Sequence, residues 1–248
     1  MRFCYFILIL DDHVDFRCFR IKNITICYVV GFFQLIIAAL SLGQHVHSWF
    51  AYHHIFLCNS NITDAANLSQ LYLAYDLIIY DYGFFHDLLG TTECVANYLD
   101  GGYLRFLWCL QHTGAILLMY PCLWCLQRYP ILLGPSMLMQ SSYALGLCIL
   151  TMATAPKTIL AVVRRPSPQL LLRMLIFYLG ELGTWIFTCA LWHHYWRLEE
   201  ALKQEKKIRK QLKMAEKAQQ QMLDSEAVFR DDTYNDFGDE EFYEPVYV

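Results

Sequence analysis

The stretch ITICYVVGFFQLIIAALSLG, residues 24–43, is a continuous apolar run without a single charged side chain. A helix of about 20 mostly apolar residues is long enough to cross a hydrocarbon core of about 30 Å. Three later stretches, residues 106–126, 131–155 and 174–195, have a similar apolar character. Pro130 separates the second stretch from the third and is suited to begin a helix. The sequence therefore predicts four transmembrane helices.

The composition agrees with an integral membrane protein. Hydrophobic residues make up 56% of the chain and charged residues 17%, whereas soluble domains have roughly 25% charged residues. The charges are also unevenly distributed, because nine of the nineteen Lys and Arg residues follow Trp196 and none lies between residues 44 and 102. We expect an all-α integral membrane fold with a large disulfide-closed first loop and a long cytosolic C-terminal helix.

The cations near the ends of the spans predict the orientation. Arg17, Arg20 and Lys22 precede the first span, and a dense basic stretch follows the fourth. The positive-inside rule therefore places both termini in the cytosol and the first loop outside the cell or in an organelle lumen. Four cations before the fourth span oppose this orientation, since alternation of the spans places them outside: Lys157, Arg164, Arg165 and Arg173.

Two sequons in the first loop, at Asn61 and Asn67, predict a glycoprotein and agree with this orientation. The expected organisation is a cytosolic N-terminal segment (1–23), the first span (24–43), the lumenal or extracellular loop (44–105), the second span (106–126), the third span (131–155), a short outer loop (156–173), the fourth span (174–195), a cytosolic basic helix (196–223) and an acidic disordered tail (224–248).

Cys58 and Cys94 are the only cysteines of the first loop. An oxidising compartment favours a disulfide between them, and the alternative is two free thiols. The same loop holds five histidines beside six carboxylates. Protonation of these histidines at an acidic lumenal pH would nearly cancel the negative charge of the loop, although we favour surface histidines without a role.

Glu181 is the one acidic residue inside a predicted span. Intramembrane acids usually face the bundle interior with a partner, and His112 lies at a similar depth in the second span. We expect Glu181 and His112 to form an intramembrane polar pair. Such a pair holds helices together by hydrogen bonding, which we favour, or lines a proton or ion pathway.

The region after the fourth span is rich in strong helix formers. Ala201, Ile208, Ala215 and Met222 recur every seven residues, as in a coiled coil, but Glu205 and Gln219 would share this seam and weaken it. Residues 203–217, from Lys203 to Lys217, include seven cations. Such a stretch attracts anionic cytoplasmic lipids or forms a solvated helix with Glu–Lys pairs, and the sequence does not favour either reading.

The C-terminal residues YEPVYV contain two overlapping docking signals. A free C-terminal Val248 preceded by Val246 fits a PDZ groove, which binds the carboxylate and adds the peptide as a strand. Tyr243 and Val246 also fit a tyrosine-based sorting signal. We therefore expect the tail to dock on PDZ or sorting-adaptor proteins.

The entry to the first span, RCFRIKNIT at residues 17–25, resembles the lysosome-associated four-span (LAPTM-like) proteins, together with Gly31 and the apolar run after it. In that family the first span follows a short cytosolic segment with Cys and Arg, and the tail carries tyrosine sorting signals. The resemblance implies four spans, an endolysosomal location and a sorting role for Tyr243 and Val246.

The chain also resembles claudin-like proteins, which have four spans, a large first loop with a cysteine pair and a Tyr-Val terminus. Cys58, Cys94 and Val248 carry this second resemblance. It implies a protein of cell junctions at the plasma membrane.

The sequence predicts a non-enzymatic membrane adaptor or organiser that recruits sorting or scaffold proteins through its tail. A claudin-like junction protein and a channel or transporter subunit using Glu181 and His112 are the alternatives. No nucleophile, base and orienting group occur at a recognisable spacing, so we expect no enzymatic activity. We also expect no cofactor, metal or nucleic acid, whereas the bilayer is the expected environment and oligomers are compatible with the sequence.

Overall fold

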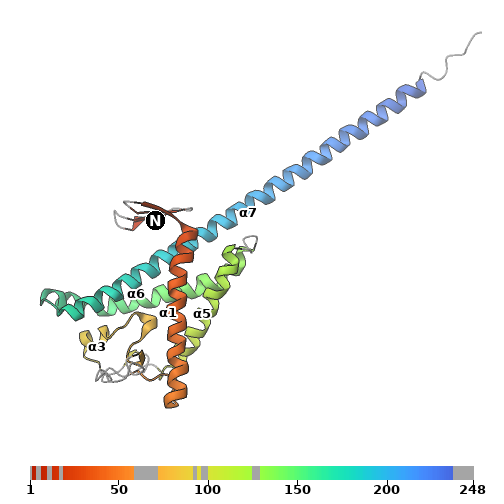
Figure 1. The fold of residues 1–248 in the computed structure, drawn as a ribbon. Coiled ribbons are helices and arrows are strands. Elements are labelled where there is room, and N and C mark those ends of the chain that lie inside the picture. The colour runs from red at the N-terminus through yellow and green to blue at the C-terminus, as the bar shows by residue number, and fades with distance from the viewer. Residues whose placement is uncertain are drawn as a thin grey trace, which may run out of the picture. The chain divides into compact units, whose positions relative to one another are not determined.

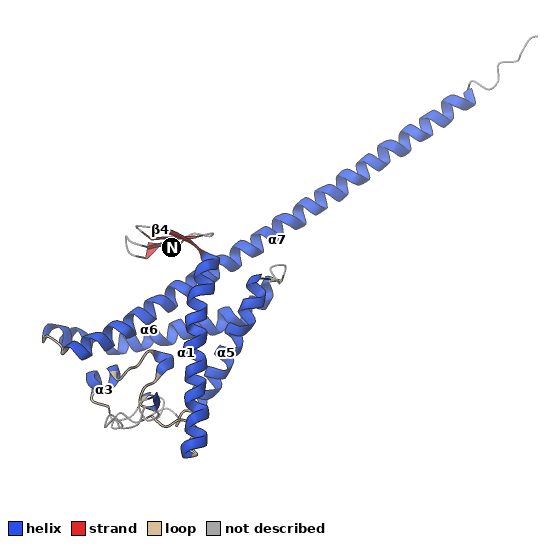
Figure 2. Ribbon diagram, in the orientation of Figure 1, coloured by secondary structure: helices blue, strands red, loops and turns tan. Residues whose placement is uncertain are grey.

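The computed structural model describes residues 2–3, 7–9, 13–16, 19–58, 72–91, 94–95, 100–124 and 129–236, with side chains from residue 21 to residue 223 within those ranges. The chain divides into two compact units, Met1–Glu199 and Glu200–Val248. The described residues are mostly helical (Figures 1 and 2).

The four predicted spans are present as four helices long and apolar enough to cross a membrane, namely Asn23–Tyr52, Tyr103–Trp124, Pro130–Val163 and Pro168–Leu223. They correspond to α1 (Asn23–Tyr52), α5 (Tyr103–Trp124), η4 (Pro130–Leu133) with α6 (Gly134–Val163), and the first part of α7 (Pro168–Asp236).

The helices extend beyond the predicted spans. α1 continues nine residues past Gly43 to Tyr52, so part of the predicted loop is helical. α6 continues through Pro156 to Val163, and α7 begins at Pro168, which reduces the predicted outer loop of residues 156–173 to four residues. The Ser167 hydroxyl accepts a hydrogen bond from Leu170 N–H at 3.3 Å. Ser167 thus caps α7, with proline in the first helical position, where its missing N–H costs nothing.

α7 is continuous from the fourth predicted span to Asp236. The disordered tail predicted for residues 224–248 is therefore wrong for residues 224–236, whose backbone is helical, whereas residues 237–248 lie outside the described part of the chain. No Gly or Pro occurs between Thr184 and Val228, so nothing in the sequence interrupts the helix there.

The all-α prediction is wrong for the N-terminal segment. Strands β1 (Arg2–Phe3), β2 (Ile7–Ile9), β3 (His13–Phe16) and β4 (Phe19–Lys22) form an antiparallel sheet in sequential order. β3 and β4 pair from His13 opposite Lys22 to Phe16 opposite Phe19. α1 then begins at the residue after β4.

The connection between α1 and α5 is folded against the helices. It contains η3 (Leu77–Ile79) and α3 (Phe84–Leu89). Phe84 and Phe85 are fully buried and contact Phe177 of α7, with ring centroids 5.1 and 5.3 Å apart. Gly180 of α7 allows the close approach of Tyr80, because a Cβ there would lie 2.6 Å from the Tyr80 ring. Burial of these aromatic side chains stabilises the loop by several kcal/mol, at about 1.5–3 kcal/mol per side chain.

Candidate functional site: a buried arginine cluster

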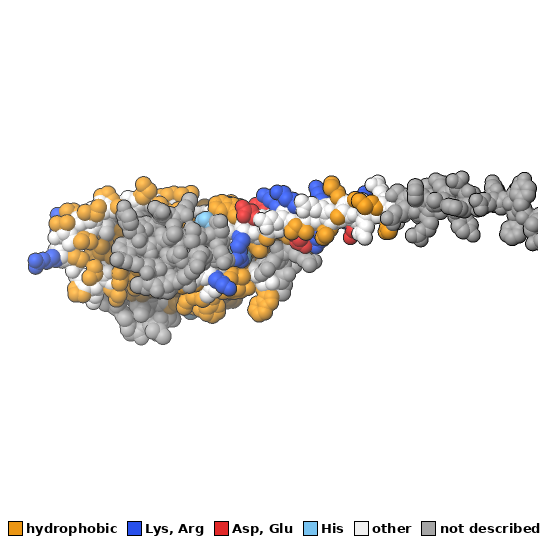
Figure 3. Space-filling view, turned by 90° about the horizontal axis from the view of Figure 1, so that it is seen from above, with side chains coloured by type: hydrophobic (Ala, Val, Ile, Leu, Met, Phe, Trp, Pro, Cys, Tyr) orange, Lys and Arg blue, Asp and Glu red, His pale blue; other side chains and the backbone are white. Residues whose placement is uncertain are grey.

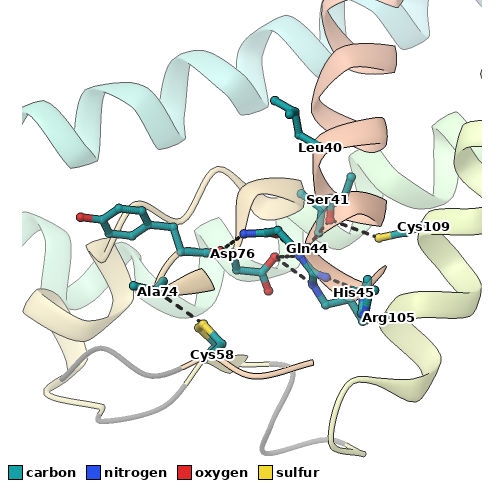
Figure 4. Close-up of polar contacts among 12 residues, drawn as sticks. Leu40, Ser41, Gln44, His45, Cys58, Ala74, Asp76, Arg105 and Cys109 are labelled. Carbon is teal, nitrogen blue, oxygen red and sulfur yellow. Dashed lines mark hydrogen bonds and ion pairs between the residues drawn. A yellow bond between two sulfur atoms is a disulfide. The ribbon is translucent and has the colours of Figure 1, made fainter. Parts of the chain in front are cut away.

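A buried polar cluster joins the end of α1, the connecting loop and the beginning of α5 (Figure 4). Arg105 lies in the first turn of α5, and its guanidinium contacts side chains from the other two segments. We define the Arg105 cluster by its members: Ser41, Gln44, His45, Asp76 and Arg105.

The turn before α5 positions the arginine. The Asp100 carboxylate accepts a hydrogen bond from Gly102 N–H at 3.1 Å and another from Leu104 N–H. Gly101 and Gly102 have φ values of 70° and 94°, which favour glycine. Gly102 is also required by space, since a Cβ there would lie 2.6 Å from the Cβ of Phe56.

An ion pair lies at the centre of the cluster. Arg105 Nε and Nη2 both donate to Asp76 Oδ1, at 3.0 and 2.7 Å. The two side chains are only 7% and 3% exposed. Because desolvation of two charges is expensive, a buried pair persists only where further hydrogen bonds satisfy the remaining donors.

Helix α1 supplies those additional acceptors from one face. Arg105 Nη2 donates to Ser41 Oγ at 2.9 Å and to Gln44 Oε1 at 3.1 Å, and Nη1 donates to His45 Nε2 at 2.5 Å. The amide nitrogen of Gln44 in turn donates to the carbonyl oxygens of Tyr72 and Tyr75, at 2.7 and 2.6 Å. The cluster therefore holds three separate segments of the chain together.

His45 is neutral in this arrangement. A guanidinium has only donors, so His45 Nε2 must accept from Arg105, and His45 Nδ1–H then donates to the Ile55 carbonyl oxygen at 2.8 Å. The imidazole also contacts the ring of Phe56, over which the Arg105 guanidinium carbon lies at 3.9 Å. Protonation of His45 would place two donors against each other, so this histidine opposes the general pH response expected for the loop histidines.

Asp81 is a second buried acid beside the cluster. Its N–H donates to the carbonyl oxygen of Asp76 at 3.1 Å, and its carboxylate accepts from Phe85 N–H at 3.3 Å. Burial, followed by the nearby charge of Asp76, raises the pKa of Asp81 from 3.8 to about 6. The folded protein therefore keeps a proton on Asp81 at pH values where the unfolded chain releases it.

This shift predicts a pH dependence of stability. The stabilisation from the proton on Asp81 is fully present below pH 3.8 and is lost as the pH rises through about 6. A shift of about two pKa units corresponds to about 3 kcal/mol. We expect the melting temperature of the purified protein to be several degrees higher at about pH 5 than at about pH 7.5.

The control is Asp81→Asn, which keeps an acceptor for Phe85 N–H but cannot ionise. This variant should lose most of the pH dependence between those two values and gain stability at neutral pH. An unchanged pH profile in the Asp81→Asn protein would show that other groups control the stability.

The two cysteines of the loop are joined. Cys58 and Cys94 form a disulfide with their Cα atoms 5.6 Å apart, and both residues are buried. The pairing expected from the sequence is thus present in the structure.

The expected pair of Glu181 and His112 does not form. Glu181 accepts a hydrogen bond from the Thr151 hydroxyl instead. His112 stacks on Trp108 with ring centroids 4.7 Å apart, and neither of its ring nitrogens has a hydrogen-bond partner among the described residues. The prediction used only the depth of each residue along its helix, and depth does not determine which way a side chain points around the helix axis.

Several predicted sites lie outside the described residues. These are the glycosylation sites and the tail signals, namely Asn61, Asn67, Tyr243, Val246 and Val248. Within the described ranges, no group of three His, Cys, Asp or Glu residues is arranged to hold a metal ion.

Sequence reasoning did not identify the Arg105 cluster, although one signal was available. Arg105 is the first cation after the long stretch that begins at residue 44, and it lies at the start of an apolar helix. A cation in that position requires a buried acidic partner or access to water. The partner, Asp76, could not be selected from the six acids of the loop without the fold.

These features define a mostly helical protein with four helices long and apolar enough to cross a membrane. The chain belongs to the family of unknown function DUF8774, whose model matches residues 6–203 and so includes the Arg105 cluster. No curated protein and no solved structure matches the chain.

Proposed function

We propose that this protein is a non-enzymatic organiser that crosses the membrane four times and recruits cytosolic proteins through the region after residue 199. The observation that carries this proposal is the exposure of α7 in the second unit. From Glu200 to Leu223, every side chain except Leu202 is exposed. A long helix that receives so little tertiary packing is a surface available to partners.

Its two faces differ in character. Ala201, Ile208, Ala215 and Met222 share one line along the helix, and Leu212 lies beside it. Ile208, Leu212 and Met222 are 55%, 57% and 68% exposed. Such an apolar stripe suits pairing with another helix. The adjacent Glu205 carboxylate, which interrupts the stripe, is paired with Arg209 at 2.5 Å within the same helix.

The lysines occupy the opposite face. Lys203, Lys210 and Lys217 are spaced by seven residues and are offset by about 200° from the apolar stripe, at 100° per residue. A helix docked on the stripe therefore leaves these cations in water. Figure 3 shows Lys and Arg side chains along the extended helix together with hydrophobic side chains.

The orientation, compartment and partners are part of the proposal. The cations after the fourth span favour a cytosolic location for the part of α7 after residue 199, and Tyr243 with Val246 favours sorting adaptors and an endolysosomal location. Val248 adds the option of a PDZ scaffold at the plasma membrane. All three tail residues follow α7 in the sequence without a further apolar span between them, so the helix end and the tail would act from one side of the membrane.

The test uses the full-length protein with a proximity-labelling enzyme at its N-terminus. Tyr243→Ala should redirect the protein from endolysosomes to the cell surface and reduce labelling of sorting adaptors at least tenfold, equivalent to about 1.4 kcal/mol of binding energy. Ile208→Glu with Leu212→Glu should remove the proteins that dock on the apolar stripe. Tyr234→Ala is the matched control for the tyrosine, and the double variant Lys203→Gln with Lys210→Gln is the control for the stripe. Both controls should retain the endolysosomal location, the labelling of sorting adaptors and the proteins docked on the stripe.

Two results would contradict the proposal. Equal labelling by all these variants would show that neither the stripe nor the tyrosine recruits proteins. Unchanged location after Tyr243→Ala, together with loss from cell contacts when one residue is added after Val248, would favour a junction protein with a PDZ-dependent tail.

A further inference from the structure

A cavity of about 380 Å³ lies beside the Arg105 cluster. Its walls come from three elements that are far apart in the sequence: η3, the first turns of α5 and the middle of α6. The volume lies within the range of sites that bind small molecules, about 300–1,000 Å³.

The cavity has an aromatic part and a charged part. Trp108 and Tyr143 line it with ring centroids 5.2 Å apart. Asp100, Arg105 and Asp76 also line it. Asp100 lies in the turn before α5 and Arg105 in its first turn, both before Trp108 in the sequence. Most of the remaining wall is aliphatic, including Ile78 and Leu147. An occupant would therefore need an apolar body with a polar group at one end.

The charges specify the kind of polar group. Arg105 is neutralised by Asp76, whereas Asp100 contributes a second carboxylate whose two oxygens accept backbone N–H groups. The lining thus has one net negative charge. An anionic headgroup would be repelled, and a hydroxyl could donate to a carboxylate oxygen, which has more than one lone pair.

The bilayer is the expected source of the occupant. α5 and α6 both belong to helices apolar enough to cross a membrane. Gly146, which lines the cavity, is exposed, and its helix neighbours Leu145 and Ile149 are 57% and 59% exposed. Apolar side chains exposed on a spanning helix face lipid, so the rim at Gly146 opens toward lipid.

Gly146 leaves the space free. A Cβ at this position would meet nothing within 4 Å. Glycine in a helix interior costs up to about 1 kcal/mol relative to alanine, and no close backbone contact at Gly146 requires it. Its effect on the structure is to leave room at the mouth of the cavity.

We propose that this cavity binds a neutral hydroxylated membrane lipid of the sterol class, with the apolar body against Trp108 and Tyr143 and the hydroxyl near Asp100. This site is separate from the exposed helix and tail of the proposed recruitment function. Loss of one would leave the other intact.

The test is photocrosslinking of full-length protein in nanodiscs with a photoreactive cholesterol analogue. We expect saturable labelling of peptides from the start of α5 or the middle of α6. Gly146→Leu should reduce this labelling at least tenfold, because its side chain fills the mouth of the cavity. Gly114→Leu is the matched control, since Gly114 also lies on an exposed helix face with nothing within 4 Å and does not line the cavity.

Competition tests the charge argument. Unlabelled cholesterol should compete, whereas its anionic hemisuccinate ester should compete at least tenfold less well. Asp100→Asn keeps one of the two oxygens that accept backbone N–H groups at the start of α5 but removes the charge. It should therefore reduce the difference in competition between cholesterol and its hemisuccinate ester. Non-saturable labelling, equal loss in the two glycine variants, or equal competition by both compounds would overturn the proposal. Melting temperatures of both glycine variants would show that they are folded.

Discussion

Arg105→Ala is expected to cost about 3–5 kcal/mol of stability, because it leaves the Asp76 carboxylate buried without its cation. It also removes the donors that satisfy Ser41, Gln44 and His45. A loss of this size approaches the total stability of many proteins, at 5–15 kcal/mol. The yield of monodisperse protein after detergent extraction and its melting temperature would measure the effect.

Arg173 provides a matched control. It forms an ion pair with Asp87, but these side chains are 24% and 32% exposed. Solvent screens such a pair, so Arg173→Ala should cost less than about 1 kcal/mol. Arg105→Met with Asp76→Leu should recover part of the loss of Arg105→Ala, because the unpaired charge is removed as well. Equally small losses of stability in Arg105→Ala and Arg173→Ala would show that the Arg105–Asp76 pair is not buried from solvent.

Removal of the disulfide is the second large effect. Cys58 and Cys94 are 36 residues apart in the sequence. Closing a loop of this length stabilises the folded state by about 4 kcal/mol in the chain-entropy model. We therefore expect Cys58→Ser with Cys94→Ser to lower the melting temperature by roughly 8–16 °C, at about 2–4 °C per kcal/mol. The closed loop contains Asp76 and Asp81, so the pH dependence should weaken in the same variant.

Cys148→Ser is the control for this experiment, since Cys148 is a free cysteine of intermediate burial. It should leave the melting temperature nearly unchanged. Peptide mapping without reduction should recover Cys58 linked to Cys94. Recovery of both cysteines as alkylated thiols would exclude the bond.

The sequence was sufficient for the number of long apolar helices but not for their ends. Length and hydropathy locate an apolar run, because crossing a hydrocarbon core sets a minimum number of residues. They do not reveal where a helix stops outside that run, as the extension of α1 to Tyr52 shows. Helix formers such as Ala, Glu and Lys continue a helix in water as readily as apolar residues do in lipid.

The candidate site was harder to predict from the sequence than the helices were, because its contacts join residues that are far apart in the chain. Arg105 and Asp76 are separated by 29 residues, and His45 lies 60 residues before Arg105. No spacing rule connects such residues. Cys58 and Cys94 could be paired because they were the only two cysteines of the loop, whereas six acids competed for Arg105. The paired strands of the N-terminal segment were missed for a related reason, since two- to four-residue strands carry little periodic signal.

The order of synthesis gives the Arg105 cluster a further consequence. Asp76 leaves the ribosome 29 residues before Arg105, a delay of roughly 1.5 to 6 s at 5–20 residues per second. During that interval the Asp76 carboxylate has no cation, and hydrogen bonds such as those from Gln44 to the Tyr72 and Tyr75 carbonyl oxygens are what can hold the loop against α1. The cluster thus closes only when the start of α5 has been synthesised, so a chain that stalls before Arg105 carries an Asp76 carboxylate without its cation.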